Sequence, residues 1–212
     1  MNNFDDNEII VILIVESCTG KTNLINTAIG LNFRESEPST TSTSYVPKLI
    51  NIGDKSYTIN LWDTISKESF HPITKLFLKD SNIIILVYDI TKLKTFEKLD
   101  YWFQEIKDNL DDTSVIGIIG NKQDLYLKEE VSEKKAKEYA TEKKSYFKLT
   151  SAKDPVSFIS ALEDLTKKYI EKNKKIVKIF EKKEVEEEDN SFGKEKKYYT
   201  KNLFFNIKYY SL

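Results

Sequence analysis

The feature that most constrains the fold is an apolar strand followed closely by a Gly-Lys-Thr sequence. Residues 9–15 are seven consecutive apolar residues, six of them Ile or Val. Such a run is typical of a strand buried on both faces. Gly20, Lys21 and Thr22 follow and open a predicted helix over residues 22–30. Glycine lets the backbone approach an anion, and the N–H groups at a helix start bind phosphate, so this segment predicts a phosphate loop.

The residues expected to line this loop are Ser17, Cys18, Thr19, Gly20, Lys21 and Thr22. Lys21 would bridge the β- and γ-phosphates, and the Thr22 hydroxyl would hold Mg²⁺. The full motif has glycine five residues before Gly20, where this chain has Val15. A β-branched residue resists positive φ, so we expect weaker phosphate binding rather than none. An ordinary turn with a glycine N-cap is the alternative interpretation.

The rest of the chain alternates between apolar strands and amphipathic helices. Further strands are expected over residues 83–88, 115–119 and 146–149, and further helices over residues 95–109, 132–141 and 155 to about 173. Extended runs at residues 45–52 and 57–62 flank Gly53-Asp54, which predicts an antiparallel hairpin. Together they predict a doubly wound α/β domain of the P-loop NTPase class, with a mostly parallel six-stranded sheet, one antiparallel strand and helices on both faces.

Composition limits the partners and the compartment. Lys and Arg number 33 against 34 Asp and Glu, so the chain has no general attraction to nucleic acid or anionic lipid. Cys18 is the only cysteine, which excludes a disulfide framework. Residues 1–8 lack a basic segment with an apolar run behind it, and no stretch reaches the roughly 18 apolar residues of a spanning helix. We expect a cytoplasmic location.

The character of the sequence changes near residue 174. The predicted organisation is one domain over residues 1–173 and a tail over residues 174–212. Residues 174–189 mix Lys and Glu, and they either extend the last helix or are disordered. Residues 198–212 contain four Tyr and two Phe. No cysteine follows Cys18, so no prenyl anchor is expected. The aromatic tail could dock on a partner, lie at a membrane interface or fold back onto the domain, and a protein partner could recruit the chain to membranes.

Two polar motifs follow successive strands and indicate which base is read. In Asn121-Lys122-Gln123-Asp124, the Asp124 carboxylate can accept from N1–H and the 2-amino group of guanine. Adenine offers neither donor and would leave that carboxylate unpaired, which disfavours it strongly. In Thr150-Ser151-Ala152-Lys153, the Ala152 N–H can bind the guanine carbonyl. Two ordinary polar loops are the alternative, but their order after a phosphate loop favours a guanine nucleotide.

These motifs make the sequence resemble a Rab-type small GTPase over residues 9–173. "LWDT", "LVYDIT", "GNKQDL" and "TSAK" stand as they do in that family. The resemblance implies that Asp63 of "LWDT" holds Mg²⁺ through water and that Thr40 supplies a hydroxyl to the metal and the γ-phosphate. Thr40 lies in a hydroxyl run over residues 39–44, so its register could slip by one. By the same resemblance, Phe33 packs against the guanine and the stem of Lys122 covers the base.

The segment after Asp63 departs from the family. Ser66 stands where the family has a glycine, and Lys67 where it has the glutamine that orients the attacking water. Lysine has three donors and no acceptor, so it cannot orient water as an amide does. The catalytic candidates are therefore Lys67, in place of the glutamine, and Lys21. Our hypothesis is that the protein hydrolyses GTP slowly.

Three functions compete. The first is a Rab-type switch in vesicle or membrane trafficking. It would be a monomer that binds GTP or GDP with Mg²⁺ and meets effector, exchange and activating proteins through its switch regions. The second is a pseudo-GTPase or nucleotide-bound scaffold, which the residues at positions 15, 66 and 67 favour. The third is an ATP-using P-loop enzyme, which Asp124 argues against.

Overall fold

The computed structural model describes residues 7–14, 17–38, 40, 42–64, 78–109 and 113–188. In the last two of these ranges, side chains are described for residues 78–107 and 113–176. Within these residues six strands form one sheet in the order β2-β3-β1-β4-β5-β6. The strands are β1 (Glu8–Ile14), β2 (Ser44–Ile52), β3 (Lys55–Asp63), β4 (Ile83–Asp89), β5 (Val115–Asn121) and β6 (Tyr146–Leu149). Only β2 runs antiparallel to its neighbour within this described sheet, which confirms the predicted fold class.

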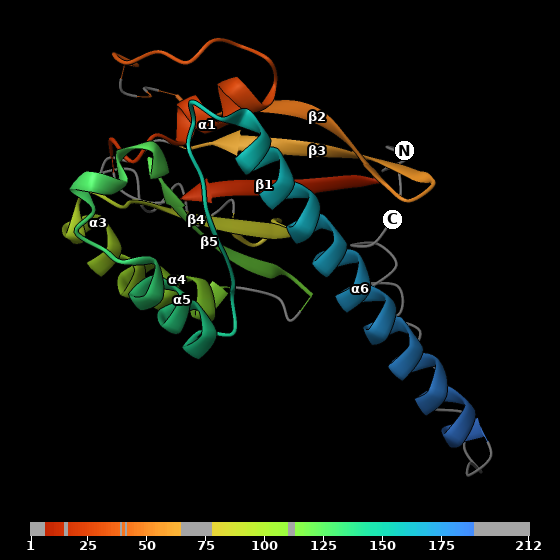
Figure 1. Ribbon diagram of the computed structural model, residues 1–212. Coiled ribbons are helices and arrows are strands. Elements are labelled where there is room, and N and C mark those ends of the chain that lie inside the picture. Colours follow the sequence, from red (N-terminus) through yellow and green to blue (C-terminus); the bar gives the residue numbers. More distant parts are fainter. Residues whose placement is uncertain are drawn as a thin grey trace.

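The sheet is covered on both faces (Figure 1). Side chains alternate along β1, so Val11 and Leu13 join one core and Ile12 and Ile14 the other. The first core includes Leu24 of α1 (Lys21–Ala28) and residues of α6 (Pro155–Glu188). The second includes residues of α3 (Leu93–Glu97), α4 (Leu99–Asn109) and α5 (Glu133–Glu142). Strands buried from both sides explain the unbroken apolar runs in the sequence.

Two helices differ from the sequence-based expectation. The helix expected over residues 95–109 is divided into α3 and α4, with Lys98 between them. The last helix was expected to end near residue 173, but α6 continues to Glu188. Residues 174–188 are rich in Lys and Glu, which are good helix formers, so the charged run extends the helix. Tyr169 and Ile170 are the last residues of α6 packed against the first core within the described side chains.

The hairpin between β2 and β3 forms as predicted, with Gly53 at φ 61° in its turn.

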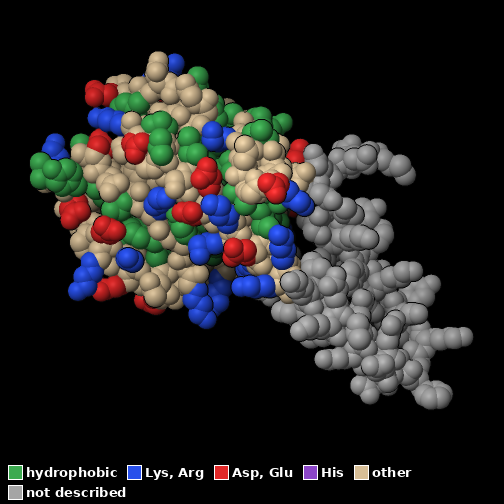
Figure 2. All heavy atoms as spheres, turned by 45° about the vertical axis from the view of Figure 1, so that its right-hand side comes forward, with side chains coloured by type: hydrophobic (Ala, Val, Ile, Leu, Met, Phe, Trp, Pro, Cys, Tyr) green, Lys and Arg blue, Asp and Glu red, His purple; other side chains and the backbone are tan. Residues whose placement is uncertain are grey.

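Surface charge is mixed in sign: Figure 2 shows acidic and basic side chains interspersed on the face of the molecule turned toward the viewer. No helix in the described ranges has the combination of length and apolarity that crossing a bilayer requires. The carboxyl ends of β1, β3, β4 and β5 lie at one edge of the sheet, where doubly wound sheets bind ligands.

Candidate functional site

The predicted phosphate loop contains two residues with positive φ. Gly20 is the N-cap of α1 and has φ 92°, in the left-handed region. A Cβ at this position would lie 2.5 Å from Nδ2 of Asn121, so a side chain at Gly20 meets both strain and a clash. Cys18 also has a positive φ, of 65°. Val15 lies outside the described residues, and its effect on the loop stays a prediction.

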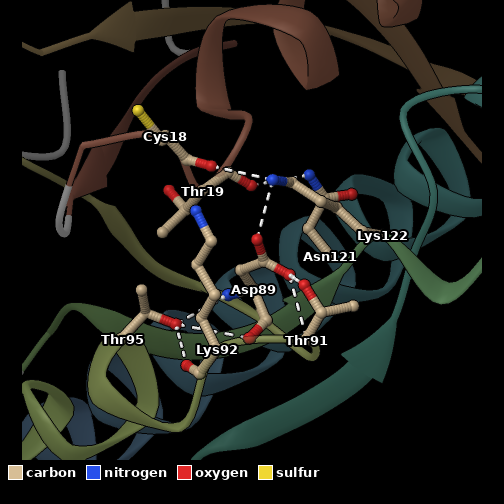
Figure 3. Close-up of polar contacts among 8 residues, drawn as sticks. All are labelled: Cys18, Thr19, Asp89, Thr91, Lys92, Thr95, Asn121 and Lys122. Atoms are coloured by element: carbon tan, nitrogen blue, oxygen red, sulfur yellow. Dashed lines mark hydrogen bonds and ion pairs between the residues drawn. The ribbon is translucent and has the colours of Figure 1, made fainter. Parts of the chain in front are cut away.

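The loop is tied to the end of β5 by two side chains. Asn121 donates from Nδ2 to the Thr19 carbonyl at 2.9 Å. Lys122 donates from Nζ to the Cys18 carbonyl, also at 2.9 Å. Figure 3 shows both side chains, from the last residue of β5 and the residue after it, directed toward the phosphate loop. These residues were expected to belong to the guanine side of the site, and the structure shows them bonded to carbonyls of the predicted phosphate loop.

Three residues expected to bind the metal come together from separate elements. Thr22 Oγ1 donates to Asp63 Oδ2 at 2.7 Å, and Thr40 Oγ1 donates to the same oxygen at 3.3 Å. The two hydroxyl oxygens lie 3.0 Å apart. Thr22 lies in the first turn of α1, Asp63 ends β3, and Thr40 lies between α1 and β2. The neighbours of Thr40 at positions 39 and 41 lie outside the described residues.

The Asp63 carboxylate suits a cation. Its Oδ1 atom is buried and has no hydrogen-bond partner among the described residues. Burial raises the pKa of the Asp63 carboxyl, while the Thr22 hydrogen bond and the Lys21 charge lower it. A divalent cation beside Oδ1 would offset the cost of burying the charged form. Hydroxyl and carboxylate oxygens are also the ligands that Mg²⁺ prefers, so these residues fit that ion.

The predicted base-reading carboxylate is held in one orientation. Ser151 donates from Oγ to Asp124 Oδ1 at 2.6 Å, and Lys153 Nζ lies 3.5 Å from Asp124 Oδ2. The backbone N–H of Lys153 donates to Ser151 Oγ at 3.1 Å, and Ala152 between them is buried. Asp124 lies in the short helix η2 (Gln123–Lys128), directly after β5. The two polar motifs, which come from different parts of the chain, therefore form one corner.

Phe33 lies beside this corner. Lys153 Nζ is 5.2 Å from the centre of the Phe33 ring, within the range of a cation–π contact. The next residue, Arg34, is anchored to α1 by two bonds to Asn23: Asn23 Nδ2 donates to the Arg34 carbonyl at 2.9 Å, and the Arg34 N–H donates to Asn23 Oδ1 at 3.1 Å. Phe33 is therefore held near Asp124 through its neighbour.

Two site residues were missed by reasoning from the sequence. Asn23 is one, and its only signal is a carboxamide directly after Thr22 at the start of the helix. Asp89 is the other. It stands within the "LVYDIT" motif, but its partner lies 33 residues away at Lys122, with Nζ 2.7 Å from Oδ2. Ser66 and Lys67 lie outside the described residues, so their expected roles stay predictions.

Comparison with known proteins agrees with this geometry. The chain matches the Ras family over residues 10–171. It is 36% identical over 163 residues to the Ras-related protein Rab-21 of Geodia cydonium, an alignment that covers 77% of this chain and 71% of the relative. It is 35% identical over 161 residues to the human Ras-related protein Rab-21, covering 76% and 72%. It is 31% identical over 155 residues to the Ras-related protein RABA1h of Arabidopsis thaliana, covering 73% and 71%.

The family match begins within β1 and ends just after Ile170 of α6, and so includes every motif discussed above. Proteins of this family bind GTP and GDP together with Mg²⁺, and they hydrolyse GTP. The predicted phosphate loop, the carboxylate of Asp124 and the oxygen cluster around Asp63 have a chemistry that fits such ligands. The chain therefore belongs to the Ras family, as a Rab-type small GTPase, a GTP-binding switch of the class that acts in membrane trafficking.

Proposed function

We propose that this GTPase binds guanine nucleotide at the described edge of the sheet but hydrolyses GTP slowly, so that its GTP-bound state is long-lived. The observation that carries the binding part is the meeting of Thr22, Thr40 and Asp63 at one end of the site, with Asp124 oriented at the other. Slow hydrolysis rests on the sequence at position 67, where lysine replaces the glutamine typical of the family.

Each part of the nucleotide has its own set of residues. The phosphates are assigned to Ser17, Cys18, Thr19, Gly20, Lys21 and Thr22. The guanine is assigned to Phe33, Asn121, Lys122, Asp124, Ser151, Ala152 and Lys153. Mg²⁺ is assigned to Thr22, Thr40 and Asp63, and when bound it neutralises charge on the β- and γ-phosphates. Support for these assignments comes from the contacts within each set and from the buried, unpaired Oδ1 of Asp63 within the described region.

Hydrolysis needs a group that positions the attacking water. A carboxamide can donate to water and accept from it, whereas the Lys67 ammonium can only donate. Lys21 still supplies positive charge beside the transferred phosphoryl group. Ser66 keeps a backbone N–H for the γ-phosphate but lacks the conformational freedom of glycine. We therefore expect binding without efficient turnover.

The test is single-turnover hydrolysis of GTP by purified protein loaded with GTP and Mg²⁺. The wild type should fall below about 10⁻⁴ s⁻¹, since intact Ras hydrolyses GTP at about 3–5 × 10⁻⁴ s⁻¹. Lys67→Gln should raise the rate about tenfold or more, which corresponds to about 1.4 kcal/mol of barrier. Lys134→Gln, which changes an exposed lysine on α5, should leave the rate unchanged. Hydrolysis by the wild type at the rate of intact relatives would mean that another group replaces the glutamine.

The second candidate is a scaffold that holds nucleotide, or nothing, without switching. The substitutions at Val15, Ser66 and Lys67 favour it. A switch should bind effector, exchange or activating proteins through its switch regions in a nucleotide-dependent way, and it should reach membranes through such a partner. Chromatography of nucleotide released from denatured protein, together with partner capture in the GTP and GDP states, distinguishes the two candidates. Partner binding that is identical in both states would favour the scaffold.

A further inference from the structure

A buried ion pair joins the two ends of the nucleotide site. Asp89 ends β4, and its side chain is fully buried, whereas that of Lys122 is 29% exposed. Lys122 Nζ lies 2.7 Å from Asp89 Oδ2 and donates to the Cys18 carbonyl at 2.9 Å. Figure 3 shows the Lys122 amino group between the Asp89 carboxylate and the phosphate loop. The amino group of Lys122, which belongs to the predicted guanine motif, thus contacts both the end of β4 and the phosphate loop.

The Asp89 carboxylate is itself fixed by the turn that follows it. Its Oδ1 accepts from the N–H of Thr91 at 2.9 Å and from Thr91 Oγ1 at 2.7 Å. The N–H of Asp89 donates to Thr95 Oγ1 at 3.0 Å, and Thr95 Oγ1 donates to the Lys92 carbonyl at 2.7 Å. Oδ1 is therefore hydrogen-bonded, whereas the buried Oδ2 has no hydrogen bond among the described residues and faces the Lys122 ammonium as an ion pair. The two bonds from Thr91 thus hold the carboxylate with Oδ2 facing Lys122.

The backbone conformation and the long side chain of Lys122 explain why its amino group needs a fixed acceptor. Lys122 has φ 69° and ψ 35°, a left-handed conformation that non-glycine residues rarely adopt. Its long side chain has four rotatable bonds and would otherwise sample many positions. An ammonium that enters a partly buried corner also needs a counter-charge to offset its lost hydration. Asp89 supplies that charge at one defined point. The stem of Lys122 must then span the distance from its own backbone to the Asp89 carboxylate.

We propose that Asp89 is a positioning residue for nucleotide retention, acting through Lys122. This inference rests on the proposed nucleotide site, in which the Lys122 stem covers the guanine and the Cys18 segment contacts the phosphates. Asp89 holds the lysine extended, so the base-covering stem and the phosphate loop are fixed by the same contact. Loss of the Asp89 charge frees the amino group, and both ends of the nucleotide lose support together.

The experiment measures release of a fluorescent GDP analogue from the full-length protein, chased with excess GDP in the presence of Mg²⁺. Asp89→Asn keeps the shape of the side chain but places a neutral group opposite the ammonium. It should accelerate release about tenfold or more, which corresponds to about 1.4 kcal/mol. Asp100→Asn is the matched control: Asp100 pairs with Lys143 at 3.1 Å on the surface, 68% exposed. Its release rate should stay within about twofold of the wild type.

A double-mutant cycle with Lys122→Met separates positioning from a merely structural role. Methionine keeps an apolar stem but removes the charge that Asp89 holds. If Asp89 acts through Lys122, Asp89→Asn adds little to release in the Lys122→Met background. An equal acceleration in both backgrounds would overturn the proposal. So would a lower melting temperature for Asp89→Asn with an unchanged release rate.

If Asp89→Asn does not fold, Thr91→Val serves as the second variant. It removes one donor to Oδ1 and leaves the ion pair charged, so release should accelerate several-fold and the effect should again vanish with Lys122→Met. Unchanged release in Thr91→Val would then overturn the inference. Failure of the wild type to take up guanine nucleotide would instead defeat the proposed function, and this inference with it. Uptake by the wild type with no effect of either variant defeats the inference alone.

Discussion

The guanine side and the metal side of the site differ in how their polar groups are satisfied. On the guanine side, Asp124 is bonded to Ser151, and Lys122 is paired with Asp89. On the metal side, Asp63 receives two hydroxyl groups on Oδ2, while its buried Oδ1 has no partner within the described region. On the guanine side of the described region, the one buried carboxylate oxygen without a hydrogen bond, Asp89 Oδ2, thus faces the Lys122 ammonium as an ion pair. On the metal side, Asp63 Oδ1 has no hydrogen-bond partner among the described residues.

This difference indicates which side depends on the ligand. Buried polar groups are nearly always paired, so an unpaired carboxylate oxygen marks a place where a cation fits. The hydroxyl of Thr40 lies 3.3 Å from Asp63 Oδ2, a longer contact than the 2.7 Å between Thr22 Oγ1 and the same oxygen. We therefore expect nucleotide and metal to reorganise the metal side, as in order–disorder switching, and to change the guanine side little.

The largest expected effect tests the guanine side. Asp124→Ala removes the acceptor for two donors of guanine, and hydrogen bonds to charged groups contribute about 1.5–3 kcal/mol each. The dissociation constant for GDP should rise by about 10²–10⁴-fold, and the preference for GDP over ADP should fall with it. Isothermal titration with both nucleotides measures this.

Asp164→Ala is the matched control for that variant. Asp164 is also a partly exposed carboxylate bonded to a hydroxyl and a lysine: Tyr146 donates to it at 2.8 Å, and Lys148 lies 3.4 Å away. It lies on α6, apart from the guanine corner, so affinity for GDP should not change. A loss of affinity as large as that of Asp124→Ala would show that the effect is a general one of destabilised structure.

The second prediction tests the metal side. Chelation of Mg²⁺ from wild-type protein should accelerate GDP release by about a hundredfold, corresponding to about 2.7 kcal/mol. Asp63→Asn should release GDP rapidly at any Mg²⁺ concentration, because the neutral carboxamide no longer attracts the ion. Release measured across a Mg²⁺ titration gives both results. A variant that remains as sensitive to chelation as the wild type would remove Asp63 from the metal site.

The smallest expected effect comes from a residue between the guanine side and the metal side, Asn23. Asn23 follows Thr22 on α1 and holds Arg34, next to Phe33, through two hydrogen bonds. Asn23→Ala should accelerate GDP release about fivefold, since a net hydrogen bond contributes about 1 kcal/mol. Asn26→Ala, on the same helix, is the control. Sensitivity to chelation should remain that of the wild type, because Thr22 and Asp63 are intact. A changed Mg²⁺ dependence would mean that the two sides are not separable.

Much of the fold was predictable because its signals are local. Apolar runs such as residues 83–88 show buried strands directly, and Gly53-Asp54 marks the hairpin turn. The break at Lys98 was not predictable, since residues 95–109 carry one continuous helical period. The extension of α6 to Glu188 was one of two alternatives that charge composition leaves open, because a mixed Lys and Glu run is compatible with either helix or disorder.

The site divides in the same way. Residue chemistry predicted the phosphate loop and a carboxylate that reads guanine, and resemblance to the family added Asp63, Thr40 and Phe33 to the predicted site. The two features that no local pattern indicated are the tether from Asn23 to Arg34 and the ion pair of Asp89. Each depends on a contact whose partner is chosen by the packing of separate elements rather than by spacing along the chain.

The sequence by itself determined which groups are available: an anion-binding loop, a carboxylate suited to guanine, and oxygen ligands for Mg²⁺. The tertiary structure decided which of them meet. In the parallel pairing of β4 with β5, Asp89 lies opposite Asn121, which places its carboxylate beside Lys122. Strand register is set by the whole hydrophobic face of a sheet, and a shift of one residue would turn Asp89 to the other face. That contact is therefore a property of the assembled sheet rather than of either motif.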